Sequence, residues 1–411
     1  MATYYLSANG CDSQDGLTPE TAWKTIDKIN QMLQGGDTVC LHCGDTFWGK
    51  IFPPRENVTG TPTTYTSYGE GPKPIVSQYK TALPDAWEDC GDGVWKLDLK
   101  NTAKFTGNVT ELDTNVGFLN IDGSIYPRKC FSPDSLELQW DFWNDDRYVY
   151  VKSSADPASL ARTICFACNI KCMRFADDLL VENIIFKGAG AHGISGTAHR
   201  AMVRNCEFHE IGGSQLPGFS VPNTRYGNGV ECWTDSSDVL VENCRFSGIY
   251  DVAITMQGNR VKSGWINMTF RGNVMWNCQQ CFEIWSSGEL PETGFVNCVF
   301  EQNVCIDSGY CWGYAVRPYK LCAAHLLLYE LKCPRCDIVI RNNTFWQARV
   351  SPIYKSGGPG QIPSDYRITG NTFFLSPGQD VAYRDGCTED EYQAFYDRLR
   401  AENHLVETAY A

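Results

Sequence analysis

The feature that most constrains this chain is a short motif that returns along its second half. The motif is apolar-x-Asn-x-x-apolar, with clear copies at residues 181–186, 203–208 and 241–246 and looser copies after them. The recurring asparagines are Asn183, Asn205, Asn243, Asn273, Asn303, Asn343 and Asn371, and their spacing ranges from 22 to 40 residues. A constant minimum period with insertions of varying length is typical of a solenoid in which each repeat forms one coil.

The physical basis of such a coil is a set of short strands that bury alternate side chains inside the solenoid. A single coil cannot bury its apolar face alone, so stacking on its neighbours supplies the core. Asparagine tolerates the left-handed bend between strands and can hydrogen-bond to its own copy one coil away. We therefore predict about seven consecutive parallel coils from about Phe175 to Tyr383, with the seven asparagines at equivalent bends.

The regions outside the repeat predict caps and an insertion. Residues 21–33 have the pattern of an amphipathic helix that closes the open end of the solenoid, and residues 389–403 resemble a second capping helix. Residues 85–165 break the period, carry four tryptophans and predict a small β insertion. The predicted organisation is residues 1–84 as the N-terminal cap and first coils, 85–165 as the insertion domain, 166–386 as the main β-helix and 387–411 as the C-terminal helix and tail.

Charge and hydropathy exclude several classes of function. The net charge is −13 and no basic block occurs, so nucleic-acid binding is not expected. No apolar run approaches the roughly 20 residues that cross a bilayer, so we expect no membrane partner. The first residues contain neither a basic segment nor an apolar one, which predicts a cytoplasmic protein.

The 20 cysteines allow two interpretations. In a reducing compartment they are expected as free thiols, and small buried thiols suit a solenoid core. The alternative is a zinc site, for which the best candidate set is Cys322, His325, Cys333 and Cys336. Because the spacing of these four residues is irregular, buried thiols are the favoured interpretation, and no metal is assigned.

Several segments resemble a known superfamily. They include residues 3–10 (TYYLSANG), 36–39 (GDTV), 141–143 (DFW) and 148–151 (YVYV). Nearly the whole chain resembles the pectate-lyase-like superfamily of carbohydrate-active enzymes, and it is most similar to β-helix glycoside hydrolases with a small β insertion. The resemblance implies an all-β, right-handed parallel β-helix that acts on an oligo- or polysaccharide. This fold hosts lyases, hydrolases, epimerases and non-catalytic binders, so the resemblance leaves the reaction open.

Aligning the coils on their asparagines places one set of strands in register. Ile194, Val230, Ile254 and Phe282 are then expected to point inward. Because side chains alternate along a strand, the residues that follow them point outward and form the column Ser195, Glu231, Thr255 and Glu283. Two residues further along, a second outward column contains Trp233, Gln257, Trp285 and Tyr329.

These two columns predict a solvent-exposed groove suited to sugar chemistry. Flat aromatic faces stack on sugar rings, and carboxyl groups transfer protons. Neighbouring coils lie ~4.8 Å apart, so Glu231 and Glu283 should be roughly 9–10 Å apart at the backbone. This separation fits an inverting glycosidase better than a retaining one. Asp251, four residues before Thr255 and also outward, is an alternative catalytic acid.

Two long insertions, at residues 212–228 and 307–324, are expected to flank this groove. The residues predicted to bind substrate are Trp233, Trp285, Gln257, Thr255, Arg225, Tyr226, Arg317, His325 and Tyr329. His192 and His209 are open to a structural or a catalytic interpretation.

Three hypotheses follow for the function. The first is a glycoside hydrolase with paired carboxylates and no cofactor. The second is a polysaccharide lyase that acts on a uronate, with Arg317, His325 or Lys355 as the base or the positive group and with Ca²⁺ as an optional cofactor. The third is a non-catalytic carbohydrate-binding solenoid. The sequence makes no prediction of the sugar or of the oligomeric state.

Overall fold

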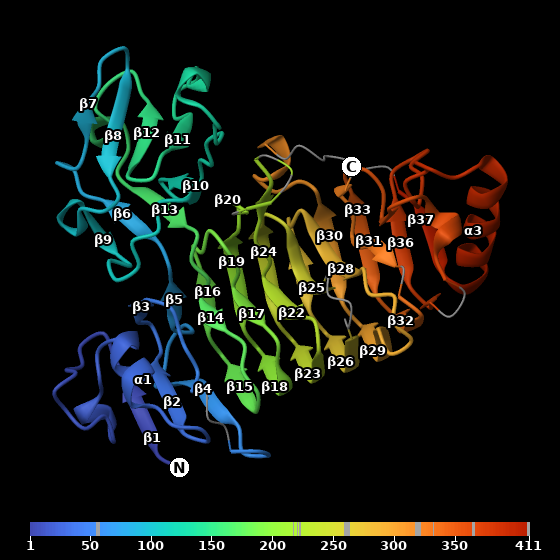
Figure 1. The fold of residues 1–411 in the computed structure, drawn as a ribbon, viewed down its shortest axis with the longest axis horizontal. Helices are drawn as coiled ribbons and strands as arrows, with labels where there is room; N and C mark the ends of the chain where they lie inside the picture. The colour runs from blue at the N-terminus through green and yellow to red at the C-terminus, as the bar shows by residue number, and fades with distance from the viewer. Residues whose placement is uncertain are drawn as a thin grey trace.

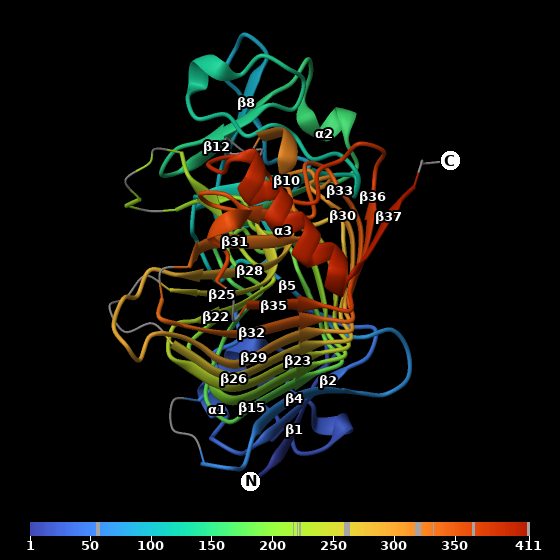
Figure 2. The same cartoon turned by 90° about the vertical axis from the view of Figure 1, so that its right-hand side faces the viewer.

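The protein was analysed as a computed structural model that describes residues 1–54, 58–216, 218–219, 221, 223–258, 264–316, 322–331, 333–363 and 366–408. Its main body is a parallel β-helix, with coils stacked from the N-terminal β1 to the C-terminal β37 (Figure 1). Each complete coil passes through three strands in turn, one from each of three parallel sheets, which Figure 2 shows edge-on. The predicted fold class is therefore confirmed.

Sheet 1 contains, in spatial order, β1 (Thr3–Leu6), β2 (Thr38–His42), β4 (Thr63–Tyr68), β15 (Leu179–Glu182), β18 (His199–Arg204), β23 (Ser236–Glu242), β26 (Gly264–Arg271), β29 (Gly294–Glu301), β32 (Arg335–Arg341) and β35 (Tyr366–Thr369). Sheet 2 contains β3 (Thr46–Trp48), β5 (Ile75–Ser77), β16 (Ile185–Lys187), β19 (Glu207–Ile211), β24 (Arg245–Ile249), β27 (Val274–Trp276), β30 (Val304–Ser308), β33 (Thr344–Ala348), β36 (Thr372–Leu375) and β37 (His404–Glu407). Sheet 3 contains β14 (Met173–Arg174), β17 (Ile194–Gly196), β22 (Val230–Trp233), β25 (Val252–Gly258), β28 (Gln280–Ser286), β31 (Leu326–Leu331) and β34 (Ile353–Lys355).

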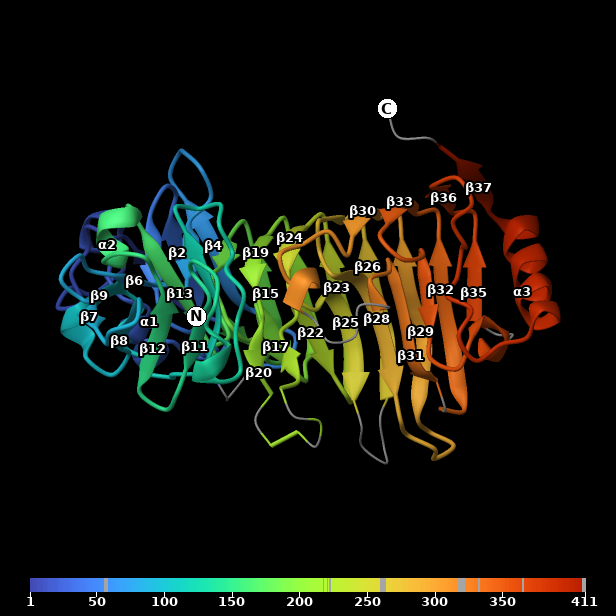
Figure 3. The ribbon, with the colours of Figure 1, turned by 90° about the horizontal axis from the view of Figure 1, so that it is seen from above.

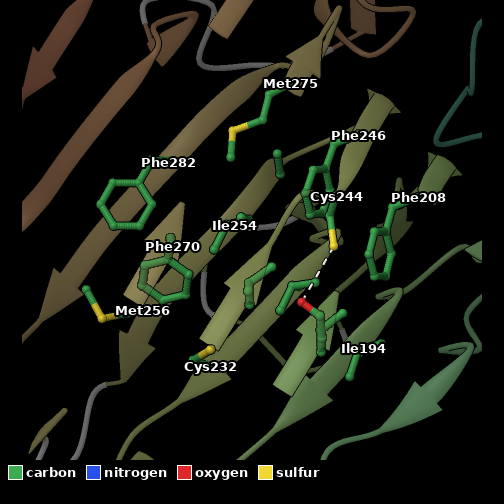
Figure 4. Close-up of a cluster of buried hydrophobic side chains, with 14 of the residues drawn as sticks. Ile194, Phe208, Cys232, Cys244, Phe246, Ile254, Met256, Phe270, Met275 and Phe282 are labelled. Atoms are coloured by element: carbon green, nitrogen blue, oxygen red, sulfur yellow. Dashed lines mark hydrogen bonds between the residues drawn. The ribbon is translucent and has the colours of Figure 1, made fainter. Parts of the chain in front are cut away.

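The interior consists of aliphatic, aromatic and cysteine side chains that stack from coil to coil. The rings of Phe186, Phe208 and Phe246 lie 5.2 Å and 4.8 Å apart in succession. Figure 4 shows part of this core, where Cys232 and Cys244 fill positions between larger side chains. Eight cysteines belong to the solenoid core at 0–1% exposure, namely Cys172, Cys206, Cys232, Cys244, Cys278, Cys281, Cys298 and Cys305. For these residues the buried-thiol interpretation is confirmed.

The bend between sheets 1 and 2 corrects one detail of the predicted register. The residues with left-handed backbone at this bend are Asn183, Asn205, Asn243, Gly272, Gln302, Asn342 and Gly370, with φ between 53° and 65°. The four later predicted asparagines, Asn273, Asn303, Asn343 and Asn371, each follow the bend by one residue. The prediction that all seven occupy equivalent positions is therefore wrong by one residue in the last four coils. There Gly272, Gln302, Asn342 or Gly370 supplies the bend, and the asparagine that follows points into the interior.

Those four inward asparagines form a hydrogen-bonded ladder. Each side-chain amide donates to the Oδ1 of the next, at 3.0 Å from Asn273 to Asn303 and 3.0 Å from Asn303 to Asn343. The ladder continues at 2.9 Å to Asn371 and at 2.9 Å to Asn403. The predicted bonding of an asparagine to its own copy is confirmed, and it satisfies polar groups that would otherwise be buried without partners.

Both ends of the solenoid carry helices. At the first end, α1 (Ile26–Met32) is shorter than predicted, because Trp23 is extended and bonded to Tyr5 and Ser7, and Thr25 caps the helix. At the other end, α3 (Glu389–Glu402) begins with a capping box at Thr388. It buries Phe395 and Leu399 against the core, and Asn403, which follows the helix, joins it to the asparagine ladder.

Residues 80–168 form a separate antiparallel region beside the N-terminal coils (Figures 1 and 3). One sheet contains β10 (Val116–Ile121), β13 (Ile164–Cys168), β6 (Lys80–Ala82) and β9 (Phe105–Gly107), and the other contains β11 (Phe142–Asn144), β12 (Tyr148–Lys152), β8 (Val94–Asp98) and β7 (Glu88–Asp89). A short helix, α2 (Pro157–Leu160), follows β12. The region has its own apolar core, built around Leu119, Phe142 and Phe166.

Candidate functional site

The outward column predicted on sheet 3 is present. Parallel pairing places Ser195 beside Glu231, Glu231 beside Thr255, and Thr255 beside Glu283. Ile194, Val230, Ile254 and Phe282 are paired in the same register and are buried in the core, as predicted. We call Ser195, Glu231, Thr255 and Glu283 the polar strip. Leu327 follows Glu283 in the same column and ends the run of polar residues.

The prediction that the polar strip is solvent-exposed is wrong. Ser195 and Thr255 are fully buried, while Glu231 and Glu283 retain 6% and 8% exposure. The physical reason is that longer side chains from adjacent positions contact them. The polar strip is therefore a set of hydrogen-bonded groups on sheet 3, in which Glu231 and Glu283 keep a small exposed fraction.

Glu231 receives contacts from both sides. Its Oε1 accepts a hydrogen bond from the Nε2 of Gln257, one coil further on. Its Oε2 lies 3.6 Å from the Nε2 of His192, on the preceding coil. The backbone N–H of Asn228 donates to the Nδ1 of His192 at 3.1 Å, so neutral His192 carries its proton on the nitrogen that faces Glu231. Glu231 is thus oriented by one hydrogen-bond donor, Gln257, with the imidazole of His192 beside its other oxygen.

Lys171 and Tyr226 complete this end of the polar strip. Lys171 donates to the Oγ of Ser195 at 2.5 Å, and Tyr226 donates to the Oδ1 of Asn169 at 2.5 Å. Burial lowers the pKa of Lys171, opposed by the charge of Glu231. Burial likewise raises the pKa of Tyr226 to about 12, with Glu231 adding to the rise. Burial also lowers the pKa of His192, so the imidazole is neutral at neutral pH.

Sequence reasoning did not select Lys171, and it left His192 undecided. The signal for Lys171 was available one coil earlier, because Met173 pairs with Ile194 and Arg174 with Ser195. Extending the outward column by one strand would have brought residues 171–174 to the edge of the polar strip.

The other carboxylate, Glu283, accepts a 2.8 Å hydrogen bond from the hydroxyl of Thr255. The second outward column lies beside it as predicted, with Trp233, Gln257 and Trp285 in register and half-buried. Tyr329 is 42% exposed and meets Trp285 edge to face at 6.4 Å. Thr255 is buried beneath Glu283 and orients it, and this corrects its predicted contact with substrate.

Two residues that were predicted to bind substrate are instead buried and bonded inside the protein. Arg225 is 5% exposed and donates to the carbonyl oxygens of Gly213 and Gly117, so it ties residues 212–228 to the insertion. His325 is fully buried and bonds the hydroxyl of Ser308 at 2.7 Å, next to Cys281. Both predictions are wrong because polar partners inside the protein hold these side chains.

Three further predicted residues, Asp251, Lys355 and Arg317, lie outside the polar strip or outside the described residues. Asp251 is half-buried just before β25, four residues before Thr255. Lys355 is buried and pairs with Leu328, an inward position, which removes it and His325 as lyase groups on the polar strip. Arg317 lies outside the described residues.

The zinc candidate set is not assembled. His325 bonds Ser308, whereas the Sγ atoms of Cys333 and Cys336 face each other at 3.9 Å and Cys322 packs beside Val252 and Leu327. Among the residues that the structure describes, no three His, Cys, Asp or Glu side chains converge as metal ligands. A search of the described helices for one long and apolar enough to cross a bilayer finds none.

Comparisons with known proteins agree with the geometry. Residues 169–317 match the family model described as "Right handed beta helix region", so the chain is a right-handed parallel β-helix. The structure of XylC in complex with xylose aligns with a TM-score of 0.51 at 11% identity, covering 91% of this chain and 69% of XylC.

Two further structures align more weakly. A GH136 lacto-N-biosidase from Eubacterium ramulus aligns at 12% identity with a TM-score of 0.39, covering 99% of this chain and 68% of the other. An alginate lyase from Paenibacillus sp. str. FPU-7 aligns at 13% identity with a TM-score of 0.46, covering 98% of both chains. Curated protein sequences give no match. At these identities the likeness concerns the fold.

Proposed function

We propose that this protein hydrolyses glycosidic bonds at the polar strip, with Glu231 and Glu283 as the paired carboxylates. The observation that carries the proposal is their shared column, with Thr255 between them. Two strand spacings separate the residues by ~9.6 Å at the backbone, within reach of the ~6.5–9.5 Å carboxyl separation of inverting glycosidases. Trp233 and Trp285 lie two residues beyond the acids and offer faces on which sugar rings stack.

The neighbours of the two acids supply orientation. Thr255 donates to Glu283, while Gln257 donates to Glu231 and His192 lies beside it. In an inverting reaction one carboxyl group protonates the leaving oxygen and the other removes a proton from the attacking water. Fixed carboxyl groups suit this reaction because proton transfer depends on geometry first.

The alternative acid Asp251 fits less well. It precedes Thr255 by four residues, and a strand advances ~3.3 Å per residue, so it lies about 13 Å along the strand from the polar strip. Glu283 shares the column of the polar strip with Glu231 and Thr255, and we assign the pair accordingly. The bound xylose of XylC, a protein of the same fold, supports a sugar as the substrate class.

A polysaccharide lyase is the second candidate, and Lys171 with Tyr226 favours it. A lyase needs a base near the uronate and a positive group for its carboxylate. Burial lowers the pKa of Lys171, which favours a neutral amine able to accept a proton. Arg174 is in register with Ser195 and supplies a positive charge at the same end. Ca²⁺ remains an optional cofactor of this alternative only.

The deciding experiment is product analysis on neutral and uronate-containing oligosaccharides. The proposal expects reducing ends with no ultraviolet absorbance, and inversion of the anomeric centre in NMR. An unsaturated uronide that appears with wild type and disappears in Lys171→Met would establish the lyase instead. Binding without any product would leave the third hypothesis, a carbohydrate-binding solenoid.

A further inference from the structure

The outward face of sheet 2 carries aromatic residues where sheet 3 carries carboxylates. One outward column is paired in register from β16 to β36. Its members are Lys187, His209, Ser247, Trp276, Ile306, Trp346 and Phe374. Trp276 is 53% exposed, and Trp346 is 37% exposed. Exposed tryptophans in one column of a sheet are uncommon unless the surface binds something.

An open cavity of about 490 Å³ lies over the N-terminal half of this column. Three rings line it, those of Tyr126 from the insertion, Trp276 from β27 and Trp312 from the segment after β30. Its polar lining includes Lys187, Glu210 and Asn277. The cavity is thus formed jointly by the solenoid and the insertion, and its size is that of a small-molecule site.

The rings of the cavity are held in place. Tyr126 and Trp312 stack at 5.9 Å with their planes 12° apart. The indole N–H of Trp312 donates to the carbonyl oxygen of Gly248 at 3.1 Å. The hydroxyl of Tyr126 donates to the Oε1 of Glu210 at 2.6 Å. Because these side chains are already ordered, a ligand that stacks on them loses little of its binding energy to ordering them.

The charges of the cavity favour a neutral ligand. Lys187 lies 3.2 Å from Glu210, so the two charges offset each other. The carboxylate of Glu210 also accepts hydrogen bonds from Tyr79 at 2.6 Å and from Asn120 at 3.2 Å, so its negative charge is compensated inside the protein. Asn277 also lines the cavity and is uncharged.

The exposed column extends this cavity along the solenoid. Trp276, Ile306, Trp346 and Phe374 follow one another at one residue per coil, ~4.8 Å apart. The rings of Trp346 and Phe374 lie 4.2 Å apart. A chain of sugar rings that leaves the cavity would therefore pass over a continuous apolar surface that is aromatic at Trp276, Trp346 and Phe374.

We propose that this cavity and column form a second carbohydrate-binding site, which takes a neutral oligosaccharide and is distinct from the polar strip on sheet 3. Flat rings and uncharged hydrogen-bonding groups are the combination that binds the face and the hydroxyls of a neutral sugar. The proposal for this second site holds or fails independently of hydrolysis at Glu231 and Glu283, because glycan binding can be measured without any turnover.

The test is a binding isotherm of the full chain on insoluble cellulose, xylan, mannan and chitin, with alginate as the charged comparison. Trp276→Ala should weaken binding to the preferred neutral glycan by about tenfold or more, equivalent to ~1.4 kcal/mol. Trp276→Phe, which keeps a ring, should restore most of it. Trp48→Ala is the matched control, because Trp48 is 47% exposed in the same column but five coils away.

Product release from a short soluble oligosaccharide should be unchanged in Trp276→Ala, since this residue is remote from the polar strip. The proposal is overturned if wild type binds none of the neutral glycans, or if Trp276→Ala and Trp48→Ala bind equally well. It is also overturned if light scattering shows a wild-type dimer that Trp276→Ala dissociates, because the column would then be a self-association surface. If wild type binds a neutral glycan but releases no product, the result counts against cleavage at the polar strip and leaves the second binding site in place.

Discussion

The outward faces of sheets 2 and 3 belong to the same coils but carry different chemistry. On sheet 3, Glu231 and Glu283 are nearly buried within a network of hydrogen bonds. On sheet 2, Trp276 and Trp346 are exposed at equivalent outward positions. Both faces rest on one interior of stacked apolar residues. Because only inward positions must satisfy that interior, the outward positions of each sheet can differ without changing the fold.

The two faces also differ in what covers them. His192 and Tyr226 come from the connections between sheets 2 and 3 and lie at the Glu231 end of sheet 3. Over sheet 2, the insertion contributes Tyr126, which leaves an open cavity. The comparison indicates that connections and the insertion, together with neighbouring outward residues such as Gln257, determine which outward groups meet solvent.

The largest effect is expected on turnover, when either of the two carboxylates of sheet 3 is replaced. Glu231→Gln and Glu283→Gln should each reduce turnover by about 10²- to 10⁴-fold, because an amide cannot exchange the proton. Initial rates on the substrate found by product analysis measure this, and circular dichroism on heating should show retained folding. Glu242→Gln is the control, since Glu242 is an outward carboxylate of sheet 1 paired with Arg271. Near-normal turnover in both variants would reject the pair and favour Asp251 or the lyase.

An intermediate effect tests whether both faces depend on one interior. Asn303→Ala removes the amide that bonds Asn273, Asn343 and the carbonyl of Phe270. Leaving several buried groups without partners should lower the free energy of unfolding by about 3 kcal/mol. Urea denaturation measures this difference, and the fall should appear in both fluorescence and circular dichroism.

Cys244→Ala is the matched control for that change. Cys244 occupies the same inward position in an earlier coil, and its thiol takes no part in the amide ladder. Removing one buried sulfur should lower the free energy of unfolding by only about 1 kcal/mol. Equal losses for Asn303→Ala and Cys244→Ala would mean that the ladder adds nothing to burial.

The smallest effect is expected in the pH dependence of the free energy of unfolding, through His192 beside sheet 3. Burial lowers the pKa of His192 below the ordinary histidine value of about 6.5. The unfolded chain therefore takes up a proton near pH 6.5 that folded His192 refuses, so the free energy of unfolding falls as the pH drops below about 6.5. The fall ends once the pH is below the folded pKa.

His192→Asn should make urea midpoints between pH 7.5 and 5 less dependent on pH. Asn can still accept from the backbone N–H of Asn228, which limits the structural change. Midpoints measured at pH 7.5, where the imidazole is neutral in both states, serve as the reference. An unchanged pH dependence would show that His192 titrates alike in the folded and unfolded chains.

Much of the fold could be predicted from the sequence because the repeat encodes it locally. Alternation of apolar residues in segments such as 230–233 and 282–285 placed Glu231, Thr255 and Glu283 in one column, and the pairing of the strands confirms that column. The bend was misplaced by one residue in the later coils, since Gly272, Gln302 and Gly370 satisfy a left-handed backbone as Asn does. Several residue types fit that conformation, so sequence does not fix the register there.

Packing between segments that are remote in sequence determines which predicted site residues meet solvent. Nothing local to Arg225 or His325 indicates that the carbonyl oxygens of Gly117 and Gly213, or the hydroxyl of Ser308, will bind them. Tyr226 likewise lies at the Glu231 end through its hydrogen bond to Asn169, which is remote in sequence. The periodic interior and the alternation of side chains follow from the amino-acid pattern, because they depend on neighbours along the chain and one coil away. Burial, hydrogen-bond partners and pKa depend on segments that are remote in sequence, and only their packing could decide them.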